Sequence, residues 1–241
     1  MFSAIGDYDR FKHTELDQWP QGFIPVMGDN TTGIAYNPHN PNVIMRVRGK
    51  THRTAHENAY YSTDSGVTWT AMKNVPDIDT NQNEFLNRAA ITTVNGANRF
   101  FWSHVRAPHT TFYSDDYGQT WTACTLADGG NLPGNVYLQV DSVNPLNVYA
   151  MEGGLRFFTS NDGGATFHQA FILNAKSRFV HVFDTEGKVL VAHGNVGLSV
   201  STNANTTEPT FTYLPNVQSA YAVGVGKPIT EDGPAAIFRA C

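Results

Sequence analysis

The segment Ser62-Thr63-Asp64-Ser65-Gly66-Val67-Thr68-Trp69 recurs as Ser114-Asp115-Asp116-Tyr117-Gly118-Gln119-Thr120-Trp121 and as Ser160-Asn161-Asp162-Gly163-Gly164-Ala165-Thr166-Phe167. A decayed fourth copy spans 201–211, with Asn203 and Asn205 in the Asp and Gly positions and three additional residues. Successive aspartates in the three intact copies are 52 and 46 residues apart. A period of this size is typical of the blades of a β-propeller.

The shared pattern, S-x-D-x-G-x-T-[W/F], is explained by turn chemistry. An Asp side chain accepts hydrogen bonds from backbone N–H groups ahead of it, and Gly adopts the positive φ that a tight turn requires. The aromatic residue then starts the next strand. We therefore interpret each copy as an Asp box that staples a hairpin, with a catalytic or metal-binding role for its aspartate as the alternative.

Four short β-rich runs surround the second box, at 88–94, 99–104, 110–114 and 121–126, and similar quartets surround the other boxes. Two more runs, 220–225 and 235–239, follow without a box. The sequence thus predicts an all-β fold, an Asp-box β-propeller of about four to five four-stranded antiparallel blades. A closed propeller generally needs more strands than this to cover the edges of its first and last blades. We therefore expect one incomplete propeller domain over 1–241. A second propeller chain or self-association would close its open edges.

Composition limits the class of ligand. The 241 residues carry a formal net charge of -5, and only 15% of them are charged. This balance disfavours binding to nucleic acid or to a membrane surface. A neutral or weakly polar ligand fits better. No run approaches the roughly 20 apolar residues of a membrane-spanning helix, and no export signal is visible at the start. We expect Cys124 to be a core thiol and Cys241 a terminal one.

Several ordered segments resemble glycoside hydrolase family 74. The start, Ser3-Ala4-Ile5-Gly6-Asp7-Tyr8-Asp9-Arg10-Phe11-Lys12-His13, is similar to the opening of that family's second propeller. Further matches are Asn40-Pro41-Asn42, Phe101-Trp102-Ser103, Val143-Asn144-Pro145 and Gly224-Val225-Gly226-Lys227-Pro228. The resemblance implies a xyloglucanase-like protein built on seven-bladed propellers, and it suggests secretion. It implies no cofactor.

The resemblance also implies a catalytic role for one residue. The family inverts configuration with an acid and a base that stand far enough apart to admit water. Asp7 matches the general acid, while the base belongs to a first propeller that this sequence does not contain. The family's Gly-Gly after this position is Asp9-Arg10 here, and Arg10 could pair with Asp7 and lower its pKa. The alternative for Asp7 is an ordinary turn aspartate.

Two other candidates, His13 and Trp19, follow the opening motif in a loop. The rest lie in or next to loops on the face opposite the boxes, where strand 2 joins strand 3 and where one blade joins the next. Trp102 stands at the base of these loops as a platform for a sugar ring, with packing inside the blade as its alternative. The pairs His52/His56 and His104/His109 lie between strands, so we interpret them as solvated loop histidines and expect no metal site. The expected substrate-binding residues are His13, Trp19, His52, Arg88, Trp102 and Arg106.

Two functions remain open from the sequence. The first is a carbohydrate-active propeller that binds β-1,4-glucan or xyloglucan-type polysaccharide or oligosaccharide, with only the general-acid half of an active site in this chain. The alternative is a non-catalytic propeller with a role in glycan binding, protein interaction or the structure of a larger assembly. Propellers host many functions, so the fold does not decide between them.

Overall fold

A computed structural model of the chain describes residues 2–5, 9–12, 17–18, 31–48, 58–76, 88–104, 109–153, 155–172, 177–181, 185–226, 233 and 236–240. Over these ranges the chain forms strands and turns and no helix, which confirms the all-β prediction. No helix that could span a membrane is found among them. The chain divides into two compact units. They are Met1–Ile91 with Asn98–Ala123 and Pro133–Asn135, and Thr92–Ala97 with Cys124–Leu132 and Val136–Cys241.

The first unit holds the first blade, most of the second and a short hairpin near the N-terminus. Each blade is an antiparallel meander whose strands are hydrogen-bonded in chain order. The first blade consists of β3 (Thr31–Asn37), β4 (Asn40–Arg48), β5 (Asn58–Ser62) and β6 (Thr70–Ala71). The second consists of β7 (Arg88–Val94), β8 (Ala97–Ser103), β9 (Thr111–Ser114) and β10 (Thr122–Ala123). The hairpin pairs β1 (Phe2–Ile5) with β2 (Asp9–Lys12).

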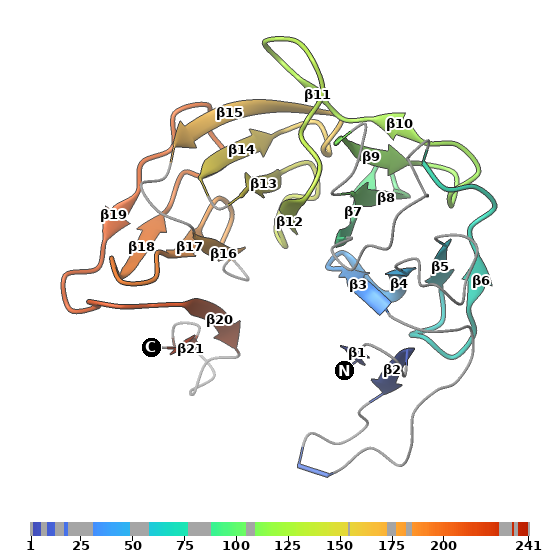
Figure 1. The fold of residues 1–241 in the computed structure, drawn as a ribbon, viewed down its shortest axis with the longest axis horizontal. Helices are drawn as coiled ribbons and strands as arrows, with labels where there is room; N and C mark the ends of the chain where they lie inside the picture. The colour runs from blue at the N-terminus through green and yellow to red at the C-terminus, as the bar shows by residue number, and fades with distance from the viewer. Residues whose placement is uncertain are drawn as a thin grey trace. The chain divides into compact units, whose positions relative to one another are not determined.

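The second unit holds two further blades and a terminal pair of strands. The third blade contains β12 (Val136–Val140), β13 (Val148–Glu152), β14 (Arg156–Ser160) and β15 (Thr166–Ile172), which lie side by side in Figure 1. The fourth contains β16 (Arg178–His181), β17 (Val189–Ala192), β18 (Leu198–Ser201) and β19 (Thr212–Tyr213). The last two strands, β20 (Ala222–Gly226) and β21 (Ala236–Ala240), pair with each other.

The chain changes sheets at Cys124, where the sequence predicted one continuous strand over 121–126. β10 ends at Ala123, and β11 (Thr125–Leu126) instead pairs in parallel with Thr166–Phe167 of β15. Cys124 between them is fully buried, as expected of a core thiol. The outermost strands of the other three blades are two residues long, whereas β15 has seven. β11 therefore covers part of the one long outer edge, which would otherwise present unpaired backbone groups.

The core lies between the faces of the sheets, where alternate residues of the second strands are directed inward. In the first unit, Met45 and Val47 of β4 pack in one cluster with Phe100 and Trp102 of β8. In the second unit, Tyr149 and Met151 of β13, Phe157 of β14 and Val189 and Val191 of β17 form another. Each large apolar side chain buried in this way contributes about 1.5–3 kcal/mol.

Candidate functional site

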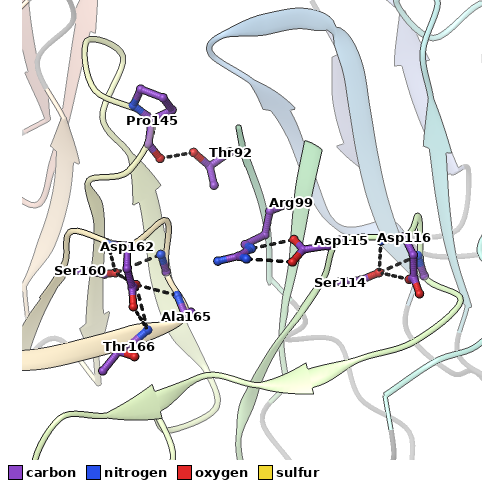
Figure 2. Close-up of polar contacts among 12 residues, drawn as sticks. Thr92, Arg99, Ser114, Asp115, Asp116, Pro145, Ser160, Asp162, Ala165 and Thr166 are labelled. Atoms are coloured by element: carbon purple, nitrogen blue, oxygen red, sulfur yellow. Dashed lines mark hydrogen bonds and ion pairs between the residues drawn. The ribbon is translucent and has the colours of Figure 1, made fainter. Parts of the chain in front are cut away.

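The Asp boxes of the first unit form closed hydrogen-bonded turns. The carboxylate of Asp64 accepts bonds from the Thr68 backbone N–H at 2.8 and 3.0 Å and from the Thr68 hydroxyl at 2.6 Å. The Ser62 hydroxyl donates to the same carboxylate at 2.7 Å and accepts from the Gly66 N–H at 2.8 Å. Ser65 and Gly66 both have positive φ, +59° and +78°. Asp116 and Ser114 repeat this arrangement in the second box (Figure 2).

The third box, in the second unit, has the same geometry. Asp162 Oδ1 accepts bonds from the backbone N–H groups of Ala165 and Thr166, each at 3.0 Å, and from the Ser160 hydroxyl at 2.7 Å (Figure 2). In the decayed fourth copy the amide oxygen of Asn203 takes the place of the carboxylate. It accepts from the Thr210 N–H at 2.9 Å. All four copies are therefore turn staples, as the sequence predicted.

The pKa shifts of the box aspartates agree with this structural role. Bonds from the Thr68 hydroxyl, the Thr68 backbone and the Ser62 hydroxyl lower the pKa of Asp64 to about 2. For Asp116 and Asp162, burial raises the pKa, but bonds from the serine, the threonine and backbone N–H groups outweigh it and the net shift is downward. A carboxylic acid with a depressed pKa holds no proton near neutral pH, so none of these residues suits the role of general acid.

In the first, third and fourth blades the box also contacts the start of the second strand of its own blade, or the turn just before that strand. The residue after the box Asp or Asn donates its backbone N–H to a carbonyl there. The pairs are Ser65 to Asn42 at 3.0 Å, Gly163 to Leu146 at 2.9 Å and Ala204 to Gly187 at 2.9 Å. Asn42 and Leu146 belong to the similar segments Asn40-Pro41-Asn42 and Asn144-Pro145-Leu146, which therefore occupy the same position in their blades.

The box serines give a common register for the four blades. The residue of the second strand that faces each box serine is Ile44, Phe100, Val148 or Val189. Four residues further along, at the end of the blade away from the box, every blade has a polar residue. These residues are Arg48, His104, Glu152 and His193. This end of the blade, which we call the loop end, therefore carries ionisable groups while the box end is occupied by turn staples.

Trp102 does not form a sugar platform at the loop end. Its side chain is fully buried, and its ring meets that of Trp121 edge to face at 5.8 Å. Stacking on a pyranose requires an exposed ring face. The alternative given by the sequence, packing within the blade, therefore accounts for Trp102, because its register position directs the side chain into the core with Phe100.

Of the remaining predicted site residues, Arg88 lies within the described part of the chain and five lie outside it. Arg88 is the first residue of β7, at the loop end of the second blade, and is half-buried. Asp7, His13, Trp19, His52 and Arg106 lie outside the described residues. The structure therefore places Arg88 at the predicted end and leaves the other five as predictions.

The two described loop histidines differ in their surroundings. His109 is exposed, as expected of a solvated loop residue. His104 is fully buried, which corrects that expectation, because it follows β8 directly and is covered rather than extended into a loop. Within the described ranges, no group of three or more His, Cys, Asp or Glu side chains could hold a metal ion.

Comparisons with known proteins agree with this architecture. The BNR/Asp-box repeat model matches residues 112–123, which include most of the second box. A xyloglucanase from a Paenibacillus species is 26% identical over 99% of the chain. A probable oligoxyloglucan-reducing end-specific xyloglucanase from Neosartorya fischeri is 24% identical over 95%. The crystal structure of the GH74 enzyme from Niastella koreensis superposes with a TM-score of 0.76 at 27% identity and covers 99% of the chain. The chain is a GH74-like Asp-box propeller.

The relatives of this GH74-like propeller are much longer proteins. The chain spans 23% of the Paenibacillus xyloglucanase, 30% of the Neosartorya protein and 32% of the Niastella enzyme. A GH74 xyloglucanase from Xanthomonas campestris shares the fold at 22% identity with a TM-score of 0.75, and the chain covers 33% of it.

The loop ends of the propeller's blades are unequal. In the third and fourth blades the second and third strands are joined by the short connections 153–155 and 193–197. In the first two blades the corresponding connections, 49–57 and 104–110, are longer and contain the candidates His52 and Arg106. Loops of variable length on a rigid scaffold are where binding residues concentrate, so the first two blades are the better place for a ligand.

One feature at the loop end of the second blade was missed from the sequence. The segment Pro133–Asn135 crosses the start of β9, where Pro133 forms a bridge with Thr110 and the Gly134 N–H donates to the His109 carbonyl. Asn135 and His109 both have positive φ, +59° and +55°. The only sequence signal was the Pro-Gly-Asn triplet before a strand, which reads as an ordinary turn.

Proposed function

We propose that this chain is a carbohydrate-active propeller that binds xyloglucan or a related β-1,4-glucan at the loop ends of its blades. The observation that carries the proposal is the similarity to a xyloglucanase along 99% of the chain, at 26% identity. Similarity over so much of the chain covers the loops as well as the boxes. It supports kinship with xyloglucan-acting proteins rather than a shared repeat alone.

The geometry supports the loop end as the binding face. At the box end, the carboxylates of Asp64, Asp116 and Asp162 already accept several hydrogen bonds within their own turns. A sugar hydroxyl would compete with those bonds. The loop end instead offers Arg88, the exposed His109 and the longer connections of the first two blades. Polar groups that converge on a concave surface fix the orientation of a carbohydrate ligand.

For catalysis, we propose Asp7 as the general acid of an inverting hydrolysis. Asp7 falls between β1 and β2, and it would donate a proton to the glycosidic oxygen as the bond to the leaving sugar breaks. A carboxylate from a second propeller would deprotonate the attacking water on the opposite face of the ring. Arg10 in β2 is the residue that could pair with Asp7 and hold it ionised.

The proposal is tested by binding and hydrolysis measured on the same preparations. The wild-type chain and the Asp7→Asn variant are titrated with xyloglucan heptasaccharide by isothermal titration calorimetry, with maltoheptaose as the α-linked control. Reducing-sugar release from xyloglucan is followed in parallel. We expect both proteins to bind the β-linked ligand in preference to the control, and any hydrolysis to disappear in the variant.

Each outcome has a defined meaning. Equal or absent binding of the two ligands would contradict the proposal as a whole. Selective binding with no hydrolysis by either protein would support glycan recognition and count against Asp7 as an acid that acts in this chain alone. Hydrolysis that survives in the Asp7→Asn variant would exclude Asp7 as the general acid.

A further inference from the structure

Two glycines in the hairpin between β17 and β18, at the loop end of the fourth blade, let a later segment of the chain lie directly on it. A Cβ atom at Gly197 would lie 2.1 Å from the carbonyl oxygen of Val217. The Gly194 N–H donates to the Ala220 carbonyl at 2.7 Å, and the Ala220 N–H donates back to the Gly194 carbonyl at 2.8 Å. Ala220 is fully buried. The backbone is therefore fixed where it reaches Tyr221.

Tyr221 is held on this hairpin and is still open to solvent. A Cβ atom at Gly194 would lie 3.7 and 3.8 Å from Cε1 and Cδ1 of the Tyr221 ring, so the ring lies beside the hairpin backbone. The Tyr221 hydroxyl donates to Asn195 Oδ1, which fixes the far end of the side chain. The residue is nevertheless 54% exposed. A ring that is already ordered loses little conformational freedom when a ligand packs against it.

The surroundings of the ring are uncharged and partly apolar. The segments 194–197 and 214–222, which form the hairpin and the chain that crosses it, contain no charged residue. Val196 in the hairpin is exposed, and so is Leu155 in the corresponding hairpin of the third blade. Such a surface offers an anionic or cationic ligand no counter-charge. It suits a neutral ligand that presents both C–H groups and hydroxyls.

We propose that Tyr221 is a platform on which a glucose ring of the bound polysaccharide stacks. A β-linked glucose ring carries its C–H bonds on its two faces and its hydroxyls around the rim, so one face packs on the aromatic ring. The exposed Asn195 amide donates to a hydroxyl at that rim. The assignment rests on the proposed function, and it adds a contact in the second unit to the candidates of the first two blades.

Substitutions of Tyr221 separate the ring from its hydroxyl. Binding is measured as retardation in native gels that contain xyloglucan, because the polysaccharide is long enough to contact more than one blade. Tyr221→Ala removes the platform and should weaken binding about tenfold. Tyr221→Phe keeps the ring and loses only the bond to Asn195, so its affinity should stay within about threefold of the wild type. Thermal unfolding followed by circular dichroism measures the stability of each variant.

Tyr36→Ala provides a matched control. Tyr36 is 49% exposed on β3, opposite Ile44, which faces the box serine Ser62, and so lies at the box end of the first blade. It should leave the affinity unchanged. An equal loss of affinity in Tyr36→Ala and Tyr221→Ala would overturn the inference.

Failure of the inference is distinct from failure of the proposed function. If Tyr221→Ala keeps the affinity of a wild type that binds xyloglucan, Tyr221 only secures the hairpin and this inference is wrong, whereas the proposed function stands. If xyloglucan does not retard the wild type, both are wrong.

Discussion

The Asp141 carboxylate accepts a hydrogen bond at 2.9 Å from the backbone N–H of Gly187, so the end of β12 holds the turn that precedes β17 in the next blade. The first unit has a counterpart, in which the amide of Asn37, the last residue of β3, donates to Asn98 Oδ1 at 2.8 Å. Asn98 and Gly187 occupy the same register position, two residues before the one that faces the box serine. The polar residue at the end of a first strand thus ties one blade to the next.

Removal of the Asp141 carboxylate should be among the most destabilising changes in the second unit. Asp141 is fully buried and also accepts from the Tyr149 hydroxyl at 2.7 Å and from the Val143 and Asn144 N–H groups at 2.8 and 3.1 Å. Asp141→Ala leaves these donors unsatisfied, so we expect it to lower the free energy of unfolding by about 3 kcal/mol or more. Denaturation in urea measures the loss.

Tyr149→Phe is the matched control for the contacts of the Asp141 carboxylate. It removes one of the donors and keeps the buried ring, so we expect a loss of about 1 kcal/mol. A loss for Asp141→Ala no larger than that for Tyr149→Phe would mean that the contact between the blades adds nothing to the fold.

Asp64 should contribute to stability against acid. Its pKa is about 2 in the folded chain, because Thr68 and Ser62 donate to the carboxylate, and about 4 in an unfolded chain. Its contribution is therefore present above pH 4 and is lost as the pH falls toward 2. In the Asp64→Asn variant the thermal midpoint, measured by circular dichroism, should therefore decrease less between pH 4 and pH 2 than in the wild type. An unchanged slope in Asp64→Asn would contradict this contribution.

The sequence predicted the features that local turn chemistry determines. The spacing of Ser62, Asp64 and Gly66 was enough to place the box, since each of these residues satisfies a backbone requirement within the turn. It did not predict the change of sheets at Cys124, because 121–126 has uniform β propensity and the choice of partner depends on β15, which lies 40 residues later. Tertiary pairing overrode local preference there.

Site residues were harder to predict than the fold. An aromatic residue before a loop is compatible both with a sugar platform and with core packing. For Trp102, only the burial of its side chain decided in favour of core packing. His104 and His109 are five positions apart and look alike in the sequence, yet one is buried and the other exposed. The positive φ of Asn135 and the close approach of Gly134 to the His104 carbonyl are features of the backbone path, which the residue types alone do not specify.

His193 should make the fourth blade sensitive to mild acid. Its ring nitrogens contact the hydroxyls of Ser177 at 2.9 Å and Ser199 at 2.7 Å, and the ring lies 5.0 Å from that of Tyr213. Burial lowers its pKa below 6.5, so the folded chain binds this proton less readily than the unfolded chain. Stability is then full above pH 6.5 and declines as the pH falls below it.

The His193 prediction is checked by urea denaturation at several pH values between 7 and 5. His193→Gln should remove part of the pH dependence, although it should also lower stability at pH 7 because glutamine does not reproduce both contacts. An unchanged slope in His193→Gln would show that other groups control the acid response.

Gly134→Ala tests the close approach of the backbone that positions Asn135. The new Cβ would overlap the His104 carbonyl oxygen, which belongs to the backbone and cannot move aside as a flexible side chain could. We expect a loss of about 2–3 kcal/mol in the free energy of unfolding. Gly129→Ala is the comparison, since Gly129 has a φ of +106° and no atom within 4 Å of the added Cβ. That variant bears only a backbone penalty of about 1–2 kcal/mol. A smaller loss at Gly134 than at Gly129 would mean that the segment 133–135 shifts easily, and that the positive φ of Asn135 is not imposed by its neighbours.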